Sequence, residues 1–198
     1  LTLFTSVGVQ VLSSKSTALR MVAAQELTEA ELGGSAVDNY LLATLKNSTD
    51  TVELQQAIKM IPKLTSKKYI IEQLVKDLIA GRISPEIQLE VLETATTISR
   101  NSPGLKMQLE HYNNYINKQD IMTRYGVALK GGNAEKGNSI FFGHAQAQCS
   151  RCHALKQIDK QVGPSLEGIA KRHSREYLLQ SIVDPQAKIT PGSGIVTG

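Results

Sequence analysis

The chain contains no tryptophan, and aromatic residues of all kinds make up only 5% of its 198 residues. This scarcity gives no support to a β-sandwich or an aromatic-rich barrel, because strands favour aromatic side chains. No apolar run approaches the roughly 18 residues of a membrane-spanning helix. Basic and acidic side chains nearly balance, at 22 against 18, so the composition does not indicate a nucleic-acid partner. A hydrophobic fraction of 41% still suffices to bury a core, in one domain or two small ones.

The two ends of the sequence lack the features of complete termini. The first four residues contain neither an initiating methionine nor the basic segment of a signal peptide. The last eight residues, 191–198, contain no capping element and no polar tail. We therefore expect a fragment of a larger or processed protein.

Apolar residues recur at the i, i+3, i+4, i+7 spacing of amphipathic helices in the first two-thirds of the chain. Three sets carry this pattern: Leu19, Val22, Ala23 and Leu27; Leu54, Ala57, Ile58 and Ile61; and Ile87, Val91, Ala95 and Ile98. Capping residues and Ser-Pro pairs predict helix starts near residues 15, 35, 50, 65, 84 and 103. Ser35 is expected to cap the second helix, and Asp50 with Glu53 to form a capping box. Residues 1–14 are left unassigned.

Alternate helix starts lie about 35 residues apart, a period typical of helix-pair solenoids of the HEAT or armadillo kind. The sequence predicts an all-α fold with HEAT-like helical hairpins over residues 1–130, including a connecting helix over about 104–129. An irregular helical bundle is the alternative. Glu and Lys along these helices are interpreted as solvent-facing, and no residue here is assigned catalytic chemistry.

A Gly-Gly pair at 131–132 breaks the helical pattern, and Asn133 can cap a new helix. We place a domain boundary there and expect a second, small domain over residues 131–198. The only two cysteines in the chain lie in it, in the sequence Cys149-Ser150-Arg151-Cys152-His153.

Two cysteines two residues apart, followed directly by histidine, are the attachment signature of a c-type haem. Cys149 and Cys152 are predicted to form thioethers to one porphyrin, and His153 to be its proximal metal ligand. A disulfide, or half of a metal site, is the alternative. A zinc site needs more ligands, and only His144 and His173 lie nearby in the sequence.

The flanking residues fit a haem pocket. Gly137 and Phe141 share a helical face on which glycine permits close helix approach and the aromatic ring can cover a cofactor edge. Further on, the segment Gly163-Pro164-Ser165-Leu166 resembles the Gly-Pro-x-Leu segment of single-haem c-type cytochromes. That resemblance implies that Pro164 packs on the proximal side and that its carbonyl orients the imidazole; an ordinary turn is the alternative.

The helix expected after Ser174 offers further contacts to the haem. Three of its apolar residues can wall the pocket: Leu178, Leu179 and Ile182. Tyr177 or Arg172 can reach a haem propionate, with a surface role as the alternative for each.

Residues 131–192 resemble the haem-binding domain of large periplasmic proteins of Planctomycetes, Verrucomicrobia and some Bacteroidetes. The resemblance is carried by residues 131–137, 141–142, 149–153, 162–166 and 181–185. In that family the domain often follows HEAT-like helices and a β-propeller similar to quinoprotein sugar dehydrogenases. The resemblance implies one covalent haem c, a periplasmic or other extracytoplasmic location, and electrons accepted from a sugar or alcohol dehydrogenase, fused or separate.

A low-spin electron carrier usually has a second axial ligand, often methionine. Every methionine precedes the cysteine motif: Met21, Met60, Met107 and Met122. We therefore expect the distal ligand beyond Gly198, as a Met-Pro segment in the related family also implies. His173, Met122 and an open five-coordinate iron are the alternatives, whereas His144 is too close to Cys149 in the sequence to reach the opposite haem face easily.

Three functions follow from these patterns. The first is electron transfer by a haem module, which needs no acid, base or nucleophile and leaves open whether the chain belongs to an enzyme. The second is a haem-based ligand sensor or peroxidase-like domain with an open iron site. The third is a scaffold in which the helical hairpins bind a partner.

Overall fold

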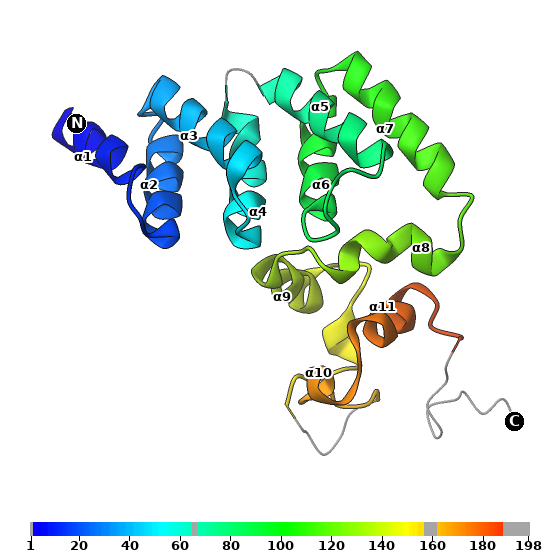
Figure 1. Ribbon diagram of the computed structural model, residues 1–198. Coiled ribbons are helices and arrows are strands. Elements are labelled where there is room, and N and C mark those ends of the chain that lie inside the picture. Colours follow the sequence, from blue (N-terminus) through cyan, green and yellow to red (C-terminus); the bar gives the residue numbers. More distant parts are fainter. Residues whose placement is uncertain (1, 65–66, 157–161, 188–198) are drawn as a thin grey trace, which may run out of the picture. The chain divides into compact units, whose positions relative to one another are not determined.

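The computed structural model describes residues 2–64, 67–156 and 162–187 of the chain (Figure 1). The described residues form helices and connecting turns, without a strand, and the expected all-α fold class is confirmed. The chain divides into two compact units, residues 1–116 and 117–198. No described helix is both long and apolar enough to span a membrane.

Unit 1 (residues 1–116) is a stack of helices in which sequence neighbours and alternate helices pack together. Its elements are α1 (Thr2–Val11), α2 (Thr17–Glu29), α3 (Gly34–Asn47), α4 (Thr51–Met60), η1 (Ile61–Lys63), α5 (Lys67–Ile79), α6 (Gln88–Ser99) and α7 (Pro103–Ile116). Helices α2, α4 and α6 form a row, each in contact with the next, and α5 contacts α6 and α7. The HEAT-like assignment of this stack stays a prediction.

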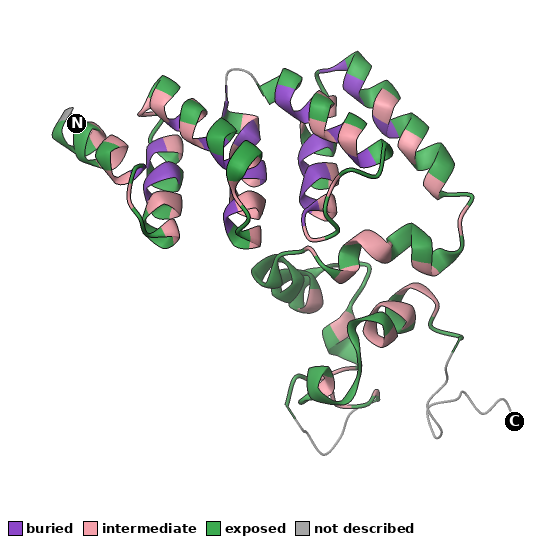
Figure 2. Cartoon of the chain, in the orientation of Figure 1, coloured by how far each residue is buried: buried purple, intermediate pink, exposed green. Residues whose placement is uncertain are grey.

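The core of unit 1 follows the predicted apolar stripes in large part. Leu27, Ile58 and Val91 are fully buried, as expected, and Figure 2 shows buried segments on α2, α4 and α6. Leu19 and Val22, in contrast, are more than half exposed. The stripe predicted for α2 is therefore wrong at its N-terminal end, where the buried face instead passes through Ala23, Ala24 and Leu27.

Several helix boundaries differ from the predictions. Helix α1 occupies a stretch for which the sequence predicts no element. Helix α6 begins at Gln88 and not near 84, because residues 84–87 form a turn closed by a hydrogen bond from the Ile87 amide to the Ser84 carbonyl. The expected helix over 104–129 is interrupted after Ile116, and a new helix starts where Asp120 accepts hydrogen bonds from two backbone amides. The predicted start near 65 falls partly outside the described residues.

Two predicted caps also differ. The residue before α3 is Gly33, at φ 82°, with no side-chain cap, so Ser35 does not cap this helix. Asp50 caps α4 by accepting from the amides of Val52 and Glu53. The Glu53 carboxylate does not return to the Asp50 amide, however, because that amide donates to Ser48 and Glu53 is buried.

Unit 2 (residues 117–198) contains α8 (Ile121–Tyr125), η2 (Gly126–Leu129), α9 (Ala134–Gly143), η3 (Cys149–Arg151), α10 (Ile169–Arg172) and α11 (Arg175–Val183). Helix α11 packs against α8 and η2, and Arg175 donates a hydrogen bond to the Leu129 carbonyl at 2.8 Å. The packing therefore assigns residues 117–130 to unit 2, whereas the sequence placed the domain boundary after residue 130. Asn133 and Ser174 cap α9 and α11.

Unit 2 differs from unit 1 in having no buried side chain among its described residues, while the described hydrophobic core lies within residues 12–109. The described apolar side chains of unit 2 are at most partly buried, whereas burial of apolar side chains is the main driving force of folding.

Candidate haem site

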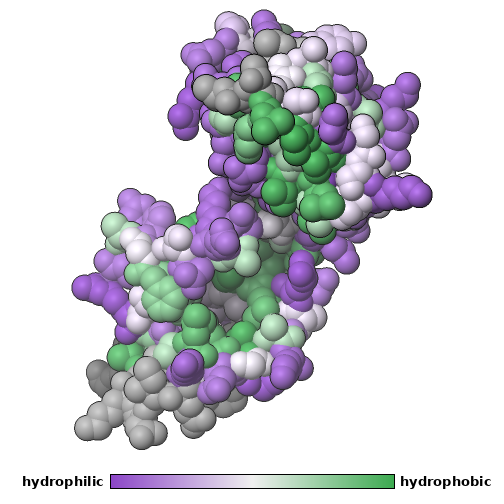
Figure 3. Space-filling model, turned by 90° about the vertical axis from the view of Figure 1, so that its left-hand side faces the viewer, coloured by the Kyte–Doolittle hydropathy of each residue, from purple (hydrophilic) through white to green (hydrophobic). Residues whose placement is uncertain are grey.

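A pocket of about 670 Å³ opens in unit 2. It is lined by Phe141, Ala147, Gln148, Cys149, Cys152, His153, Leu166, Ile169, Leu178, Ser181 and Ile182. Figure 3 shows apolar side chains around the hollow of this unit. The lining comes from α9, the cysteine turn, α10 and α11, so it collects residues more than 40 positions apart in sequence.

The cysteine turn is closed by its own backbone. The amides of Cys152 and His153 both donate to the Cys149 carbonyl, at 3.2 and 3.0 Å. This tight turn brings both sulfurs and the imidazole to one pocket. Both cysteines are free thiols, Cys149 half-buried and Cys152 exposed. Among the described residues, no three His, Cys, Asp or Glu side chains gather as a metal site, so the zinc alternative finds no support there.

The His153 ring is held by the backbone. Its Nδ1 lies 2.9 Å from the Pro164 carbonyl oxygen. A carbonyl can only accept, so Nδ1 carries the proton of the neutral imidazole, and Nε2 keeps the lone pair that a metal needs. This is the arrangement by which an outer hydrogen bond orients a histidine ligand and makes it more basic.

Gly163 allows the Pro164 segment to lie against the cysteine turn. Its amide donates to the Cys152 carbonyl at 2.9 Å, and the Leu166 amide donates to the Ala154 carbonyl at 2.8 Å. A Cβ on Gly163 would lie 2.9 Å from the Cys152 carbonyl oxygen and 2.9 Å from Cε1 of His153. Only glycine fits here, so this segment is more than an ordinary turn.

Gln148, immediately before the cysteine turn, was not predicted to have a role. It has a left-handed backbone, at φ 46°, which is uncommon for a residue other than glycine. Its amide donates to the His144 carbonyl, its carbonyl accepts from the Arg151 amide, and its side-chain oxygen accepts from Arg151 at 2.6 Å. Nothing in the local sequence signals this conformation.

The predicted pocket residues fall into two groups. Phe141, Leu166, Leu178 and Ile182 line the pocket together with the cysteines and His153. Pro164 does not line it and acts through its carbonyl alone. Tyr177 also lies outside the lining and stacks on His173, with ring centroids 4.0 Å apart.

Arg172 donates to the Glu167 carbonyl, and its contact with a haem propionate stays a prediction. Leu179 lies outside the pocket lining. The close helix approach expected at Gly137 is wrong for the described residues, because a Cβ there would meet none of their atoms within 4 Å.

The in-chain candidates for a second axial ligand do not line the pocket either. Nδ1 of His144 accepts from the amides of Gln146 and Ala147, at 3.3 and 3.1 Å. His173 is engaged with Tyr177, and Met122 is half-exposed on α8. The segments 157–161 and 188–198, which include part of the region resembling periplasmic haem domains, lie outside the described residues.

The site fits a haem in size and in chemistry. Its volume lies within the range of small-molecule and cofactor pockets, and its lining is mostly apolar with a few convergent polar groups. Those groups are two thiols and one imidazole whose Nδ1 is already bonded. Cys149 and Cys152 would hold the porphyrin, and His153 would ligate the iron.

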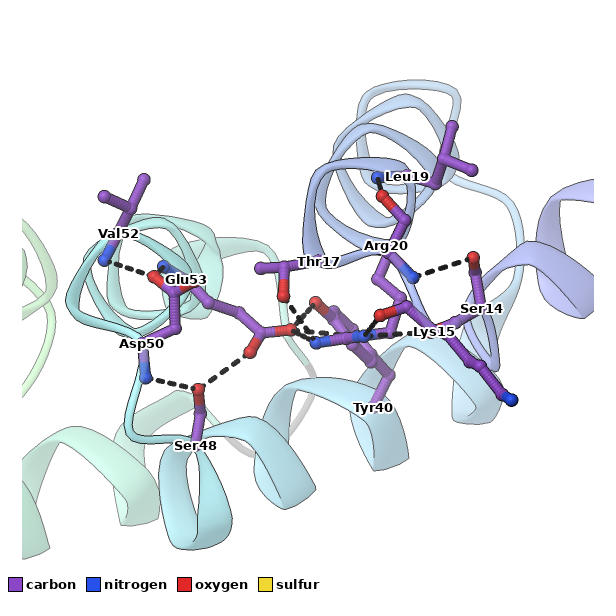
Figure 4. A network of polar contacts seen from close by, with 11 residues as sticks. Ser14, Lys15, Thr17, Leu19, Arg20, Tyr40, Ser48, Asp50, Val52 and Glu53 are labelled. Carbon is purple, nitrogen blue, oxygen red and sulfur yellow. Dashed lines mark hydrogen bonds and ion pairs between the residues drawn. The ribbon is translucent and has the colours of Figure 1, made fainter.

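Unit 1 holds a second polar cluster, centred on the buried carboxylate of Glu53 (Figure 4). One oxygen accepts from Arg20 at 2.7 Å and from the Tyr40 hydroxyl at 2.9 Å, and the other accepts from Ser48 at 2.7 Å. Burial raises the pKa of Glu53, but the hydrogen bonds from Ser48, Arg20 and Tyr40 together outweigh burial and lower it. Every partner belongs to unit 1 itself, so the cluster joins α2, α3 and α4 and offers no free group for chemistry.

No protein-family model and no solved structure matches the chain. It is 38% identical over 65 residues to a cytochrome c-553-like protein of Synechocystis sp. (strain ATCC 27184 / PCC 6803 / Kazusa). The alignment covers 33% of this chain and 56% of that protein, so the chain spans little more than half of the relative's length. The similarity supports a c-type cytochrome domain.

Proposed function

We propose that unit 2 binds one haem c covalently and serves in electron transfer. The observation that carries this proposal is the convergence of two thiols and one imidazole with a fixed Nδ1 in a single, mostly apolar pocket. Cys149 and Cys152 form the thioethers, and His153 is the proximal ligand. Haem supplies a one-electron couple at iron, so no side chain has to act as acid, base or nucleophile.

The residues of the chain have distinct parts in this function. The cysteines fix the position of the porphyrin relative to His153. The Pro164 carbonyl holds the imidazole in one tautomer and orientation. The apolar lining from Phe141, Leu166 and Leu178 excludes water and lowers the local dielectric, which influences the reduction potential.

We further propose that the haem domain is the electron-accepting module of an extracytoplasmic sugar or alcohol dehydrogenase, fused to it or separate. The resemblance of residues 131–192 to domains of large periplasmic proteins supports this role, and so does the helical stack that precedes the domain. The name of the cyanobacterial relative, cytochrome c-553-like, agrees with electron transfer. Thioether attachment takes place outside the cytoplasm, which supports the location.

A haem with an open iron site is the second candidate. It is favoured by the pocket lining, which contains no methionine and, apart from His153, no histidine among the described residues. A protein of this kind binds carbon monoxide or peroxide at iron and does not act mainly as an electron carrier.

The test is expression of the full chain with c-type maturation machinery, followed by mass spectrometry and optical redox titration. One haem per chain that survives acid-acetone extraction and titrates reversibly is expected, and Cys149→Ala with Cys152→Ala should abolish the covalent attachment. Recovery of the cysteine-containing chain without haem would contradict the proposal. A high-spin spectrum that changes with carbon monoxide would favour the open site over the electron carrier.

A further inference from the structure

The turn formed by residues 144–148 connects α9 to the cysteine motif and delivers Cys149 to the pocket. Two of its residues, Ala147 and Gln148, line the pocket next to Cys149. All five residues of the turn are exposed, so burial in a core does not hold their shape. The conformation of the turn therefore depends on its own hydrogen bonds.

Most of these hydrogen bonds start or end at His144. The His144 amide donates to the Ile140 carbonyl at 3.1 Å and ends α9, and the Gln148 amide donates to the His144 carbonyl at 3.1 Å. Nδ1 of the His144 ring accepts from the amides of Gln146 and Ala147, at 3.3 and 3.1 Å. One residue thus closes both the last turn of α9 and the turn that follows it.

His144 acts on this turn as aspartate acts at a helix N-cap. Its backbone is extended, at φ −74° and ψ 118°, and its ring accepts from the amides two and three residues further on. Asp50 and Asp120 also have extended backbones, and Oδ1 of each accepts from the amides at the same two positions. Nδ1 of histidine and Oδ1 of aspartate are both bonded to Cγ, so the imidazole can take the place of the usual capping oxygen.

The cap determines which nitrogen of the neutral His144 ring carries the proton. A backbone amide can only donate, so Nδ1 uses its lone pair on the amides and the proton lies on Nε2. His153 has the opposite tautomer, with its proton on Nδ1 and its lone pair on Nε2. In this arrangement His144 has no lone pair left for a metal, and what its ring does is hold the chain.

We propose that His144 is a positioning residue for the haem, whose neutral ring holds the turn in the shape that brings Ala147, Gln148 and Cys149 to the pocket. The left-handed backbone of Gln148, at φ 46°, supports this role, because a strained conformation persists only where its surroundings hold it. The inference rests on the proposed haem function and adds to it the residue that sets the entry of the chain into the haem site.

The experiment compares three variants with the unaltered full chain, each loaded with haem. His144→Ala removes the acceptor, and His144→Asn keeps an acceptor in the same place. The control, Asp120→Ala, removes an equivalent cap from α8, which does not line the pocket. Amide hydrogen exchange measured by NMR reports on the turn, circular dichroism in the Soret band on the surroundings of the haem, and optical titration on its reduction potential.

In His144→Ala we expect the amides of Gln146 and Ala147 to exchange about fivefold faster, the usual effect of losing an N-cap on the equilibrium between ordered and open turn. The Soret circular dichroism should weaken and the reduction potential should shift, because the pocket-lining residues of the turn no longer keep one position. His144→Asn should restore all three signals. Asp120→Ala should lower the melting temperature of unit 2 and leave the Soret spectrum and the potential unchanged.

The outcomes separate positioning from a general effect on stability. Unchanged exchange at Gln146 and Ala147 in His144→Ala would overturn the cap. Faster exchange with an unchanged Soret spectrum and potential would show a cap that only stabilises the turn, and would overturn the positioning role. Failure of His144→Asn to restore the signals would overturn it as well, because an acceptor at this place would then not suffice.

Two results concern haem loading. If His144→Ala takes up no haem, His144→Asn decides: loading at the level of the unaltered chain supports the positioning role, and no loading overturns it. If the unaltered chain itself carries no covalent haem, the proposed function fails and this role fails with it, whereas every other adverse result leaves the proposed function standing.

Discussion

Gly163 gives the sharpest test of how His153, the proposed iron ligand, is held. In Gly163→Ala the new Cβ would lie 2.9 Å from the Cys152 carbonyl oxygen and 2.9 Å from Cε1 of His153, about half an ångström closer than ordinary contact. Neither neighbour is the free end of a flexible side chain, since one is backbone and the other is the ligand ring. The segment must therefore move away from the cysteine turn.

This movement has two consequences. Overpacking of this size costs about 1–3 kcal/mol, which for a small unit corresponds to a fall in melting temperature of about 4–8 °C per kcal/mol. The hydrogen bond of 2.9 Å between Nδ1 of His153 and the Pro164 carbonyl is also weakened. In the proposed haem complex the imidazole would become a poorer donor to ferric iron, so the reduction potential should rise.

Gly137→Ala is the matched control, because it adds the same methyl group in the same unit where no atom lies within 4 Å. Within α9 this change should stabilise by about 0.5–1 kcal/mol through helix propensity. Denaturant titration followed by circular dichroism in the Soret band reports on unit 2 alone, and optical titration gives the potential. Equal stability and equal potential for the two variants would refute the steric argument at Gly163.

Three further predictions concern both units. Glu53→Gln leaves Arg20 without its charged partner and should lower the free energy of unfolding of unit 1 by about 2–4 kcal/mol; a loss below 0.5 kcal/mol by urea titration would contradict this. The pKa of Glu53 is lower in the folded than in the unfolded state. Its contribution to the free energy of unfolding is therefore complete above the unfolded pKa of about 4.3 and is lost as pH falls through the folded pKa. The stability of Glu53→Gln should accordingly vary less below pH 4 than that of the natural sequence. Glu31→Gly should raise the free energy of unfolding by about 0.5–1 kcal/mol, because Glu31 has a left-handed backbone, at φ 56°, after α2. A lower melting temperature of this variant would disprove backbone strain there. Replacing Cys149 and Cys152 by serine should leave unit 1 cooperatively folded but strip unit 2 of hydrogen-exchange protection, and retained protection in unit 2 would show a core independent of haem.

The fold of unit 1 could be predicted where periodicity and burial agree. Leu27, Ile58 and Val91 lie on the buried faces that the i, i+3, i+4 spacing indicates. The prediction failed where the pattern continued onto a face that the neighbouring helix α1 covers only in part, as at Leu19 and Val22, which line an open pocket with residues of α1. Periodicity identifies an apolar face, but it does not say how many turns of that face another helix contacts.

Glu53 shows a different limit of prediction from the sequence. Its position three residues after Asp50 is the spacing of a capping box, and the first half of that box is present. Its carboxylate is instead bound by Arg20, 33 residues earlier, and by Tyr40. A local pattern cannot reveal a competing partner at that distance in sequence, and a charged hydrogen bond in a buried site outweighs a cap.

In the candidate haem site, too, some features could be predicted from the sequence and others could not. The cysteine motif is local, so Cys149, Cys152 and His153 could be assigned from five consecutive residues, and the structure places all three at one pocket. The left-handed Gln148 and the need for glycine at 163 arise from contacts that form only when the chain folds back on the turn.

The weak apolar pattern of the last third has a physical cause in the pocket. Phe141, Leu166 and Ile182 belong to segments of different structure, and what they share is a pocket and not a helix–helix contact. Side chains that face a cofactor need no regular spacing, because the cofactor is a single body that each segment reaches from its own direction. The proposed haem would account in the same way for the absence of buried side chains from the described part of unit 2. Haem attachment and the folding of unit 2 would then be one event, because the haem would supply the apolar core.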